Sequence, residues 1–181
     1  PLAPRLLVTG QDFHYGQKRG GSLDTLRAAG FQVEGLAKVG DASGQSYGSS
    51  RIRQAIRDAD FGQVAALMGA PWTLTSRVET GDQIGRTIGF PTANLSMGGY
   101  LRPPIGIYAA RVGIGEDEPD LPAAAYYGYR PSIDGQQERF EVHLLDFDGD
   151  LYGQQLRVAL IAHLRGDKAL DGLKALQAQI A

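Results

Sequence analysis

The sequence predicts a mainly β protein in which an antiparallel barrel or sandwich follows a short α/β unit. Glycine is frequent, with 25 among 181 residues, which favours turns and tight loops over long helices. Segments rich in Val, Ile, Tyr and Thr recur after Pro71, each bounded by Gly, Pro or Asp. Before Pro71, apolar strand-like segments alternate with helical ones, which is typical of α/β structure.

Residues 1–70 are expected to form the α/β unit. Residues 6–8 are continuously apolar and predict a short buried strand, and residues 31–39 alternate weakly and predict a second one. Between them, residues 22–29 predict a helix, because a serine precedes the segment's apolar positions and a glycine follows them. Two further helices are expected, at residues 49–58 and 61–68.

Residues 71–181 are expected to form the β domain. Residues 139–144 alternate strictly between polar and apolar side chains, which is typical of a strand with one buried face. Residues 167–180 place three leucines and an isoleucine on one helical face, so we expect a C-terminal helix to close the domain. The predicted strands comprise residues 72–79, 105–112, 121–127, 139–147 and 151–162.

Bulk composition disfavours several classes of partner. The formal charge is −2 at pH 7, and residues 71–181 hold 10 Lys and Arg against 14 Asp and Glu, so no nucleic-acid partner is expected. No apolar run approaches the ~20 residues that a membrane helix needs, so no membrane partner is expected either. The chain has no cysteine, which fits the reducing cytoplasm. The sequence carries no signal for an oligomeric state.

The densest chemical pattern lies in residues 81–94, where glycines recur every four residues before Thr92 and Asn94. Backbone N–H groups of such glycines cradle phosphate oxygens. Threonine and asparagine oxygens suit a Mg²⁺ ion that also binds phosphate. The segment lacks the Gly-Lys-Ser/Thr ending of a Walker A loop. A glycine-rich hairpin connection is the alternative.

This segment, GDQIGRTIGFPTANL, resembles the ATP-binding stretch of riboflavin kinases. Residues 10–19 and 47–53 are similar to motifs of bacterial FAD synthetases. The chain thus resembles the C-terminal part of bifunctional riboflavin kinase/FAD synthetases. The resemblance implies an antiparallel kinase barrel at residues 71–181, preceded by part of a Rossmann-like nucleotidyltransferase domain. Further kinase motifs follow in the family's order as PIGIY (104–108), RPS (130–132), EVH (141–143), DFDGDLYG (146–153), LR (164–165) and LQAQI (176–180).

The resemblance implies an enzyme that transfers the γ-phosphate of ATP to the 5′-hydroxyl of riboflavin, giving FMN, with Mg²⁺ as cofactor. Glu141 would be the general base, because phosphoryl transfer to an alcohol needs a proton acceptor. An ordinary solvent-facing strand carboxylate is the alternative role of Glu141. Thr92 and Asn94 would bind Mg²⁺ and ATP phosphates; a capping threonine and a turn asparagine are the alternatives.

Other positions receive roles from the same resemblance. Arg130 and Arg165 would contact the flavin or the product phosphate, or else form salt bridges. His143 would support Glu141 from the same strand face, or be a satisfied histidine at the barrel rim. Asp148 and Gly149 predict a hairpin turn, since the surrounding aspartates do not fit an EF-hand. The phosphate loop would comprise Gly81, Gly85, Gly89 and Arg86, of which Arg86 could also be a surface residue.

The helix at residues 49–58 begins with two serines and two arginines. A helix N-terminus with nearby guanidinium groups can bind the phosphates of a nucleotide. A simple N-cap is the alternative. The residues expected to do this are Ser49, Ser50, Arg51 and Arg53.

The sequence departs from the family pattern at several positions. It contains no H-x-G-H motif and begins at Pro1, so we expect FAD synthesis only in a longer parent protein. Gly48 replaces a serine. Bulky rings stand before RPS where small residues are usual, and Leu170 replaces Phe, which would reshape the flavin site. A non-catalytic flavin- or nucleotide-binding module is therefore the alternative function. The rings belong to Tyr126, Tyr127 and Tyr129.

Overall fold

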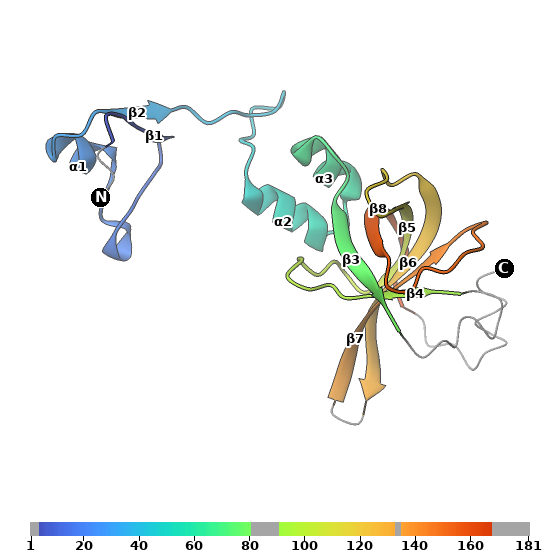
Figure 1. The fold of residues 1–181 in the computed structure, drawn as a ribbon. Coiled ribbons are helices and arrows are strands. Elements are labelled where there is room, and N and C mark those ends of the chain that lie inside the picture. The colour runs from blue at the N-terminus through green and yellow to red at the C-terminus, as the bar shows by residue number, and fades with distance from the viewer. Residues whose placement is uncertain (1–3, 81–90, 133–134, 168–181) are drawn as a thin grey trace. The chain divides into compact units, whose positions relative to one another are not determined.

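A computed structural model describes residues 4–80, 91–132 and 135–167 of the chain (Figure 1). The chain divides into two compact units, Pro1–Gly48 and Ser49–Ala181. The phosphate loop predicted at residues 81–89 lies outside the described residues. So does the predicted C-terminal helix, except for Asp167 at its expected start.

The first unit is the predicted strand–helix–strand arrangement. Strand β1 (Leu7–Gly10) pairs in parallel with β2 (Val33–Leu36), and helix α1 (Leu23–Ala28) connects them after a short 3₁₀ helix, η1 (Gln17–Arg19). Ser22 and Thr25 form a capping box at the start of α1, which satisfies backbone groups that a helix leaves unpaired at its N-terminus.

The second unit opens with helices α2 (Ser49–Arg57) and α3 (Phe61–Met68). The Asp60 carboxylate accepts a hydrogen bond from the Gln63 amide at 2.9 Å and so caps α3. Residues of both helices join the core cluster of the barrel, and the Phe61 ring meets the Tyr108 ring edge-on at 5.7 Å. The compact unit therefore begins at Ser49, whereas the composition change that predicts a domain division lies near residue 70.

The β domain is a closed antiparallel barrel, as predicted. Its strand order is β3-β4-β7-β6-β5-β8, and β8 pairs with β3 to close it (Figure 1). Closure gives each of the six barrel strands a neighbour on both sides in the described residues, although the three-residue β4 pairs with only part of β3 and β7. The strands are β3 (Thr73–Glu79), β4 (Ala93–Leu95), β5 (Gly106–Ile114), β6 (Leu121–Ser132), β7 (Gly135–Leu144) and β8 (Gln155–Arg165).

The structure corrects the predicted elements in three respects: a missed strand, the ends of two strands and a turn. The pattern did not predict β4, because three residues are too few to establish an alternation. Strand β7 ends at Leu144 and β8 begins at Gln155, so residues 145–154 form a connection instead of strand ends. The hairpin turn predicted at Asp148 and Gly149 is wrong, because β7 and β8 are not neighbours in the barrel.

The alternation predicted for residues 139–144 decides which face of β7 points inward. Phe140, Val142 and Leu144 are buried in the barrel core, and Glu141 and His143 lie on the opposite face. The same rule buries Tyr127 of β6 and Tyr108 of β5. In a strand, successive side chains point to opposite faces, so residues adjacent to buried ones face outward.

Gly106 allows a close backbone approach at the start of β5. Its φ is +157°, and an added Cβ would collide with the Arg165 carbonyl and the His163 ring. We expect Gly106→Ala to destabilise the protein by about 2–3 kcal/mol, through strain and overpacking at this position. Thermal or denaturant unfolding of the purified chain measures this.

Gly99→Ala is the matched control. A Cβ at Gly99 meets nothing within 4 Å, so its unfolding free energy should stay within about 0.5 kcal/mol of the parent value. Equal stability of the two variants would show that the approach at Gly106 is not tight.

Candidate active site

One row of cross-strand neighbours brings predicted site residues together on the outside of the barrel. Asn94 of β4 lies opposite Glu141 of β7, and Glu141 lies opposite Tyr126 of β6. Directly opposed residues in an antiparallel pair share one face, with Cβ atoms about 5 Å apart. We call this set the outer row, and from β3 around to β8 it comprises Glu79, Asn94, Glu141, Tyr126, Ile107 and Arg165.

The outer row holds two carboxylates, of which Glu141 is half-buried and Glu79 is exposed. The Glu141 side chain is 20% exposed, and an oxygen lies 3.6 Å from an Arg130 guanidinium nitrogen. Arg130 comes from β6, where it pairs with Gln137 in the part of the β6–β7 ribbon that extends beyond Tyr127. The structure thus places a carboxylate and a guanidinium, predicted as base and flavin contact, next to each other.

Thr92 and Asn94 flank the buried Ala93 and are both half-buried. His143 fixes the chain just before them, because its Nδ1 lies 2.8 Å from the Pro91 carbonyl oxygen. This hydrogen bond favours the satisfied-histidine alternative for His143. It also ties β7 to the start of β4, so the hydroxyl and amide oxygens of Thr92 and Asn94 are presented from an anchored segment.

A cleft of about 490 Å³ opens beside Thr92. The loop that forms its far wall is held to β3, because Arg77 donates to the Gly153 carbonyl at 2.5 Å and the Val78 amide donates to Gln154. The Asp150 carboxylate accepts from the Tyr152 amide at 3.0 Å and so orders the loop internally. Apolar and polar groups mix in the lining, which includes Val78, Pro91, Thr92, Val142, Phe147, Asp148, Asp150 and Tyr152.

The three tyrosines that precede RPS do not act as one cluster. Tyr127 and Tyr129 belong to a polar network at the end of the core, whereas Tyr126 stands in the outer row. The Tyr126 hydroxyl donates to the Asp167 carboxylate at 3.2 Å. Burial, with Asp167 adding to it, raises the pKa of Tyr126 to about 12, so this phenol is a neutral hydrogen-bond donor at neutral pH.

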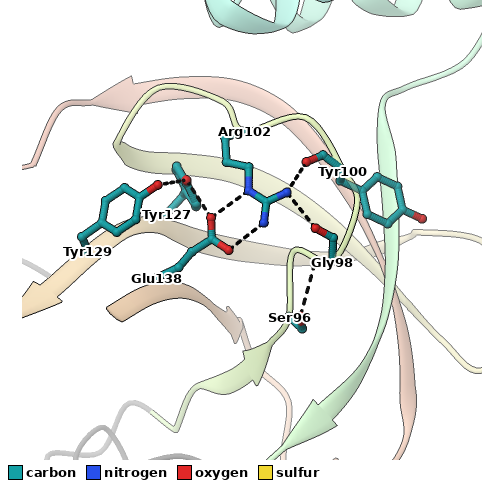
Figure 2. A network of polar contacts seen from close by, with 7 residues as sticks. All are labelled: Ser96, Gly98, Tyr100, Arg102, Tyr127, Tyr129 and Glu138. Carbon is teal, nitrogen blue, oxygen red and sulfur yellow. Dashed lines mark hydrogen bonds and ion pairs between the residues drawn. The ribbon is translucent and has the colours of Figure 1, made fainter. Parts of the chain in front are cut away.

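The network around Arg102 was not predicted from the sequence. Figure 2 shows its guanidinium between Glu138 and the carbonyl oxygens of Gly98 and Tyr100. Arg102 donates two hydrogen bonds to the Glu138 carboxylate, at 2.8 and 2.9 Å. The Tyr127 hydroxyl donates to the same carboxylate at 3.0 Å. A signal that could have pointed to it is Glu138 itself, which lies one residue before the predicted strand, in step with the inward-facing Phe140 and Val142.

Charge and burial shift the titration of this network. The hydrogen bond from Arg102 holds the pKa of Glu138 below its usual range, against the opposing effect of burial. The same hydrogen bond raises the pKa of Arg102. Burial, with the bonds to Tyr129 and Glu138, raises the pKa of Tyr127. The hydrogen bonds from Arg102 to Glu138 hold the β4–β5 connection against β7.

The remaining predicted residues lie elsewhere or outside the described chain. Arg53 donates a hydrogen bond to the Ser49 hydroxyl at 2.9 Å, one turn earlier in α2. Ser50 and Arg51 occupy the same first turn of α2. Within the described residues, no group of three or more His, Asp or Glu side chains is placed to hold a metal ion. Outside the described residues lie Gly81, Gly85, Arg86 and Gly89.

The sequence profile described as riboflavin kinase (flavokinase) matches residues 68–181, which is more than half of the chain. The chain belongs to the riboflavin kinase family. The matched range contains the whole barrel, the outer row and the Arg102 network. The predicted family and the predicted barrel are both confirmed.

Similar proteins extend the likeness over the first unit. The chain is 37% identical to a bifunctional riboflavin kinase/FMN adenylyltransferase of Escherichia coli K12, covering 99% of this chain and 58% of that protein. It is 31% identical to the protein of the same name in Bacillus subtilis, over 96% of this chain and 56% of that one. The chain therefore spans less than two thirds of the length of these relatives.

A solved structure shows the same fold. It is named a macrolide-efflux protein from Streptococcus pneumoniae and is 32% identical, with a TM-score of 0.80, over 97% of this chain and 57% of that chain. In the part of the chain that the structure describes, no helix has the length and apolar character to cross a membrane.

The Arg102 network should make stability depend on pH. Because the pKa of Glu138 is lower in the folded protein than the ~4.3 of an unfolded chain, its carboxylate stabilises the fold above that value. This contribution is lost as pH falls through the folded-state pKa. We expect Glu138→Gln to cost about 1 kcal/mol of unfolding free energy at pH 7 and less as pH falls below ~4.

Denaturant unfolding at pH 7 and at about pH 3.5 measures both effects. Glu118→Gln is the control, because Glu118 also contacts an arginine, at 3.2 Å, but its side chain is 83% exposed. The control should change stability by less than ~0.5 kcal/mol. A pH-independent cost at Glu138 would mean that shape, and not charge, matters there.

Proposed function

We propose that residues 68–181 transfer the γ-phosphate of ATP to the 5′-hydroxyl of riboflavin, giving FMN and ADP. The single observation that carries this proposal is the register that sets Asn94, Glu141 and Tyr126 side by side, with Arg130 at 3.6 Å from Glu141. A proton acceptor, oxygen ligands and a guanidinium are the groups that phosphoryl transfer to an alcohol requires.

Glu141 is proposed to accept the proton of the riboflavin hydroxyl. As the hydroxyl oxygen forms its bond to the γ-phosphorus, the proton passes to a Glu141 oxygen and the bond to the β-phosphate oxygen breaks. Arg130 faces the same carboxylate and can also face phosphate oxygens, so it would offset charge that develops there. Both residues come from paired strands, with Glu141 four residues along β7 from Gln137, the direct partner of Arg130.

Thr92 and Asn94 are proposed to hold Mg²⁺ together with ATP phosphates. Their donors fit the ion, since both offer neutral oxygens from one anchored segment and a hard cation prefers oxygen ligands. Bound there, Mg²⁺ would neutralise phosphate charge. The cleft beside Thr92 is wide enough for part of a nucleotide and has both apolar and polar walls. Of the proposed ligands, Thr92 lines this cleft, and Thr92 and Asn94 both lie on the β4 side of Glu141, so we propose that ATP approaches from that side.

The whole natural protein is proposed to make FAD as well. The E. coli and B. subtilis relatives are named as FMN adenylyltransferases in addition to riboflavin kinases. The α/β unit and the start of α2 would then belong to the adenylyltransferase, with Ser49, Ser50, Arg51 and Arg53 near nucleotide phosphates. We propose the cytoplasm, where ATP and a reducing environment are present, as its location.

The proposed base predicts a specific kinetic change. Glu141→Gln keeps shape and polarity but removes proton acceptance, so kcat should fall by roughly 10²- to 10⁴-fold. The riboflavin KM should change little, because proton transfer belongs to the transition state. FMN formation from riboflavin and Mg-ATP, followed by chromatography, measures both constants.

Glu116→Gln is a matched control on an exposed side chain of the β5–β6 connection and should leave kcat unchanged. A Glu141→Gln enzyme within threefold of the parent kcat would remove Glu141 from the mechanism. Absence of FMN formation by the parent chain would defeat the kinase proposal and favour the non-catalytic flavin-binding alternative.

The proposed metal ligands predict a change in magnesium dependence. Thr92→Ala and Asn94→Ala should each raise the Mg²⁺ concentration needed for half-maximal activity by at least about tenfold, because each loses one oxygen ligand. A Mg²⁺ titration at saturating riboflavin measures this, and EDTA should abolish activity. Thr73→Ala is the control and should keep the parent titration, because the Thr73 hydroxyl, at the start of β3, donates to the Pro71 carbonyl.

A further inference from the structure

Tyr126 is the aromatic residue of the outer row and lies next to the proposed base. It is half-buried and stands between Ile107 of β5 and Glu141 of β7. Its ring lies back along β6 over Gly128, because a Cβ at Gly128 would collide with the Tyr126 hydroxyl oxygen and ring. Because Gly128 has no side chain, it leaves the space that the phenol of Tyr126 occupies. Gly128 lies between Tyr126 and Arg130 on the outer face of β6.

The hydroxyl of Tyr126 fixes the ring from its other end. It donates to Asp167 at 3.2 Å, and Asp167 lies two residues after the end of β8. Since β5 lies between β6 and β8 in the barrel, this hydrogen bond spans a whole strand. The phenol remains protonated at neutral pH, so it is a constant donor to the carboxylate. The Tyr126 ring is therefore fixed at one end by the backbone of β6 and at the other by the hydrogen bond from its hydroxyl to Asp167.

The direction of phosphoryl transfer assigns a side to each substrate. The attacking and leaving oxygens lie roughly in line across the transferred phosphorus. If the phosphates are held at Thr92 and Asn94 on the β4 side, the acceptor reaches Glu141 from the opposite, β6 side. The outer-row residue on that side is Tyr126. A flat aromatic ring suits a flat conjugated acceptor by stacking or edge contact.

We propose that Tyr126 forms the acceptor-side wall of the active site, contacting riboflavin with its ring while Asp167 and Gly128 set the position of that ring. This inference rests on the proposed riboflavin kinase function and deepens it. Tyr126 is thus a binding and specificity residue, separate from the base, and Asp167 and Gly128 are positioning residues that act through it.

Two variants disturb the position of the ring at residue 126 in different ways. Tyr126→Phe removes the bond to Asp167 and keeps the ring. Gly128→Ala keeps the tyrosine but pushes its ring off the strand. Each should raise the riboflavin KM, and the riboflavin Kd from flavin fluorescence, by roughly 3- to 10-fold, the range for one lost hydrogen bond or contact. The kcat should stay within about twofold, because the base is untouched.

The double variant tests whether both act through the same group. Tyr126→Phe with Gly128→Ala should be no worse than about the larger single effect, since coupled changes are not additive. Tyr129→Phe is the control. It removes a hydroxyl from the same strand, but that hydroxyl lies 3.0 Å from the Tyr127 hydroxyl, in the Arg102 network. Its riboflavin Kd should equal the parent value.

The outcomes separate this inference from the kinase proposal. If the parent chain makes FMN and both single variants keep the parent KM and Kd, the proposed contact of Tyr126 with riboflavin is disproved and the kinase function stands. If melting temperature falls while Kd stays constant, Tyr126 is only structural and the inference is overturned. If the parent makes no FMN but binds riboflavin, the kinase proposal fails, and an unchanged Kd in the variants would overturn the wall as well. No riboflavin binding by the parent overturns both.

Discussion

The strand register of the closed barrel is the constraint on which the rest of the structure depends. A shift by one residue would exchange the inner and outer faces of a strand. Phe140 and Val142 bury themselves in the core, and this forces Glu141 outward between Asn94 and Tyr126. Because every strand pairs on both sides, no single strand can slip without breaking two ladders. The placement of these outward side chains is therefore in large part a consequence of core packing.

Two sets of polar contacts at the margin of the core also hold β4 in place. Arg102 joins the β4–β5 connection to Glu138 of β7 through a bidentate ion pair, which the hydroxyl of the buried Tyr127 extends. His143 joins the other end of β4 to β7 through Pro91. Strand β4 is only three residues long, so its ladder alone holds it weakly. Anchoring on both sides holds Asn94 beside Glu141, as the proposed metal and phosphate site would require.

The helices α2 and α3 belong to the barrel by packing. Phe61 contacts both Trp72 and Tyr108, and Val64 is fully buried in the same cluster. The described helices and barrel strands from Ser49 onward therefore share one hydrophobic core. In the proposed bifunctional parent protein, residues expected near adenylyltransferase phosphates would start a helix that is packed against the kinase barrel. The composition change near residue 70 marks a change of secondary structure and not the edge of the core.

The sequence by itself determined the class of fold, the alternation that buries one face of residues 139–144, the three α-helices before Pro71, the family and the residues of its motifs. These depend on local periodicity, on caps and on motif spacing, all of which are written along the chain. Only the tertiary structure decided that Asn94, Glu141 and Tyr126 are neighbours, that Arg102 meets Glu138 across 36 positions, and that residues 145–154 connect strands lying apart. Strand order and register are set by which apolar faces pack together over long separations, and no local pattern records that choice.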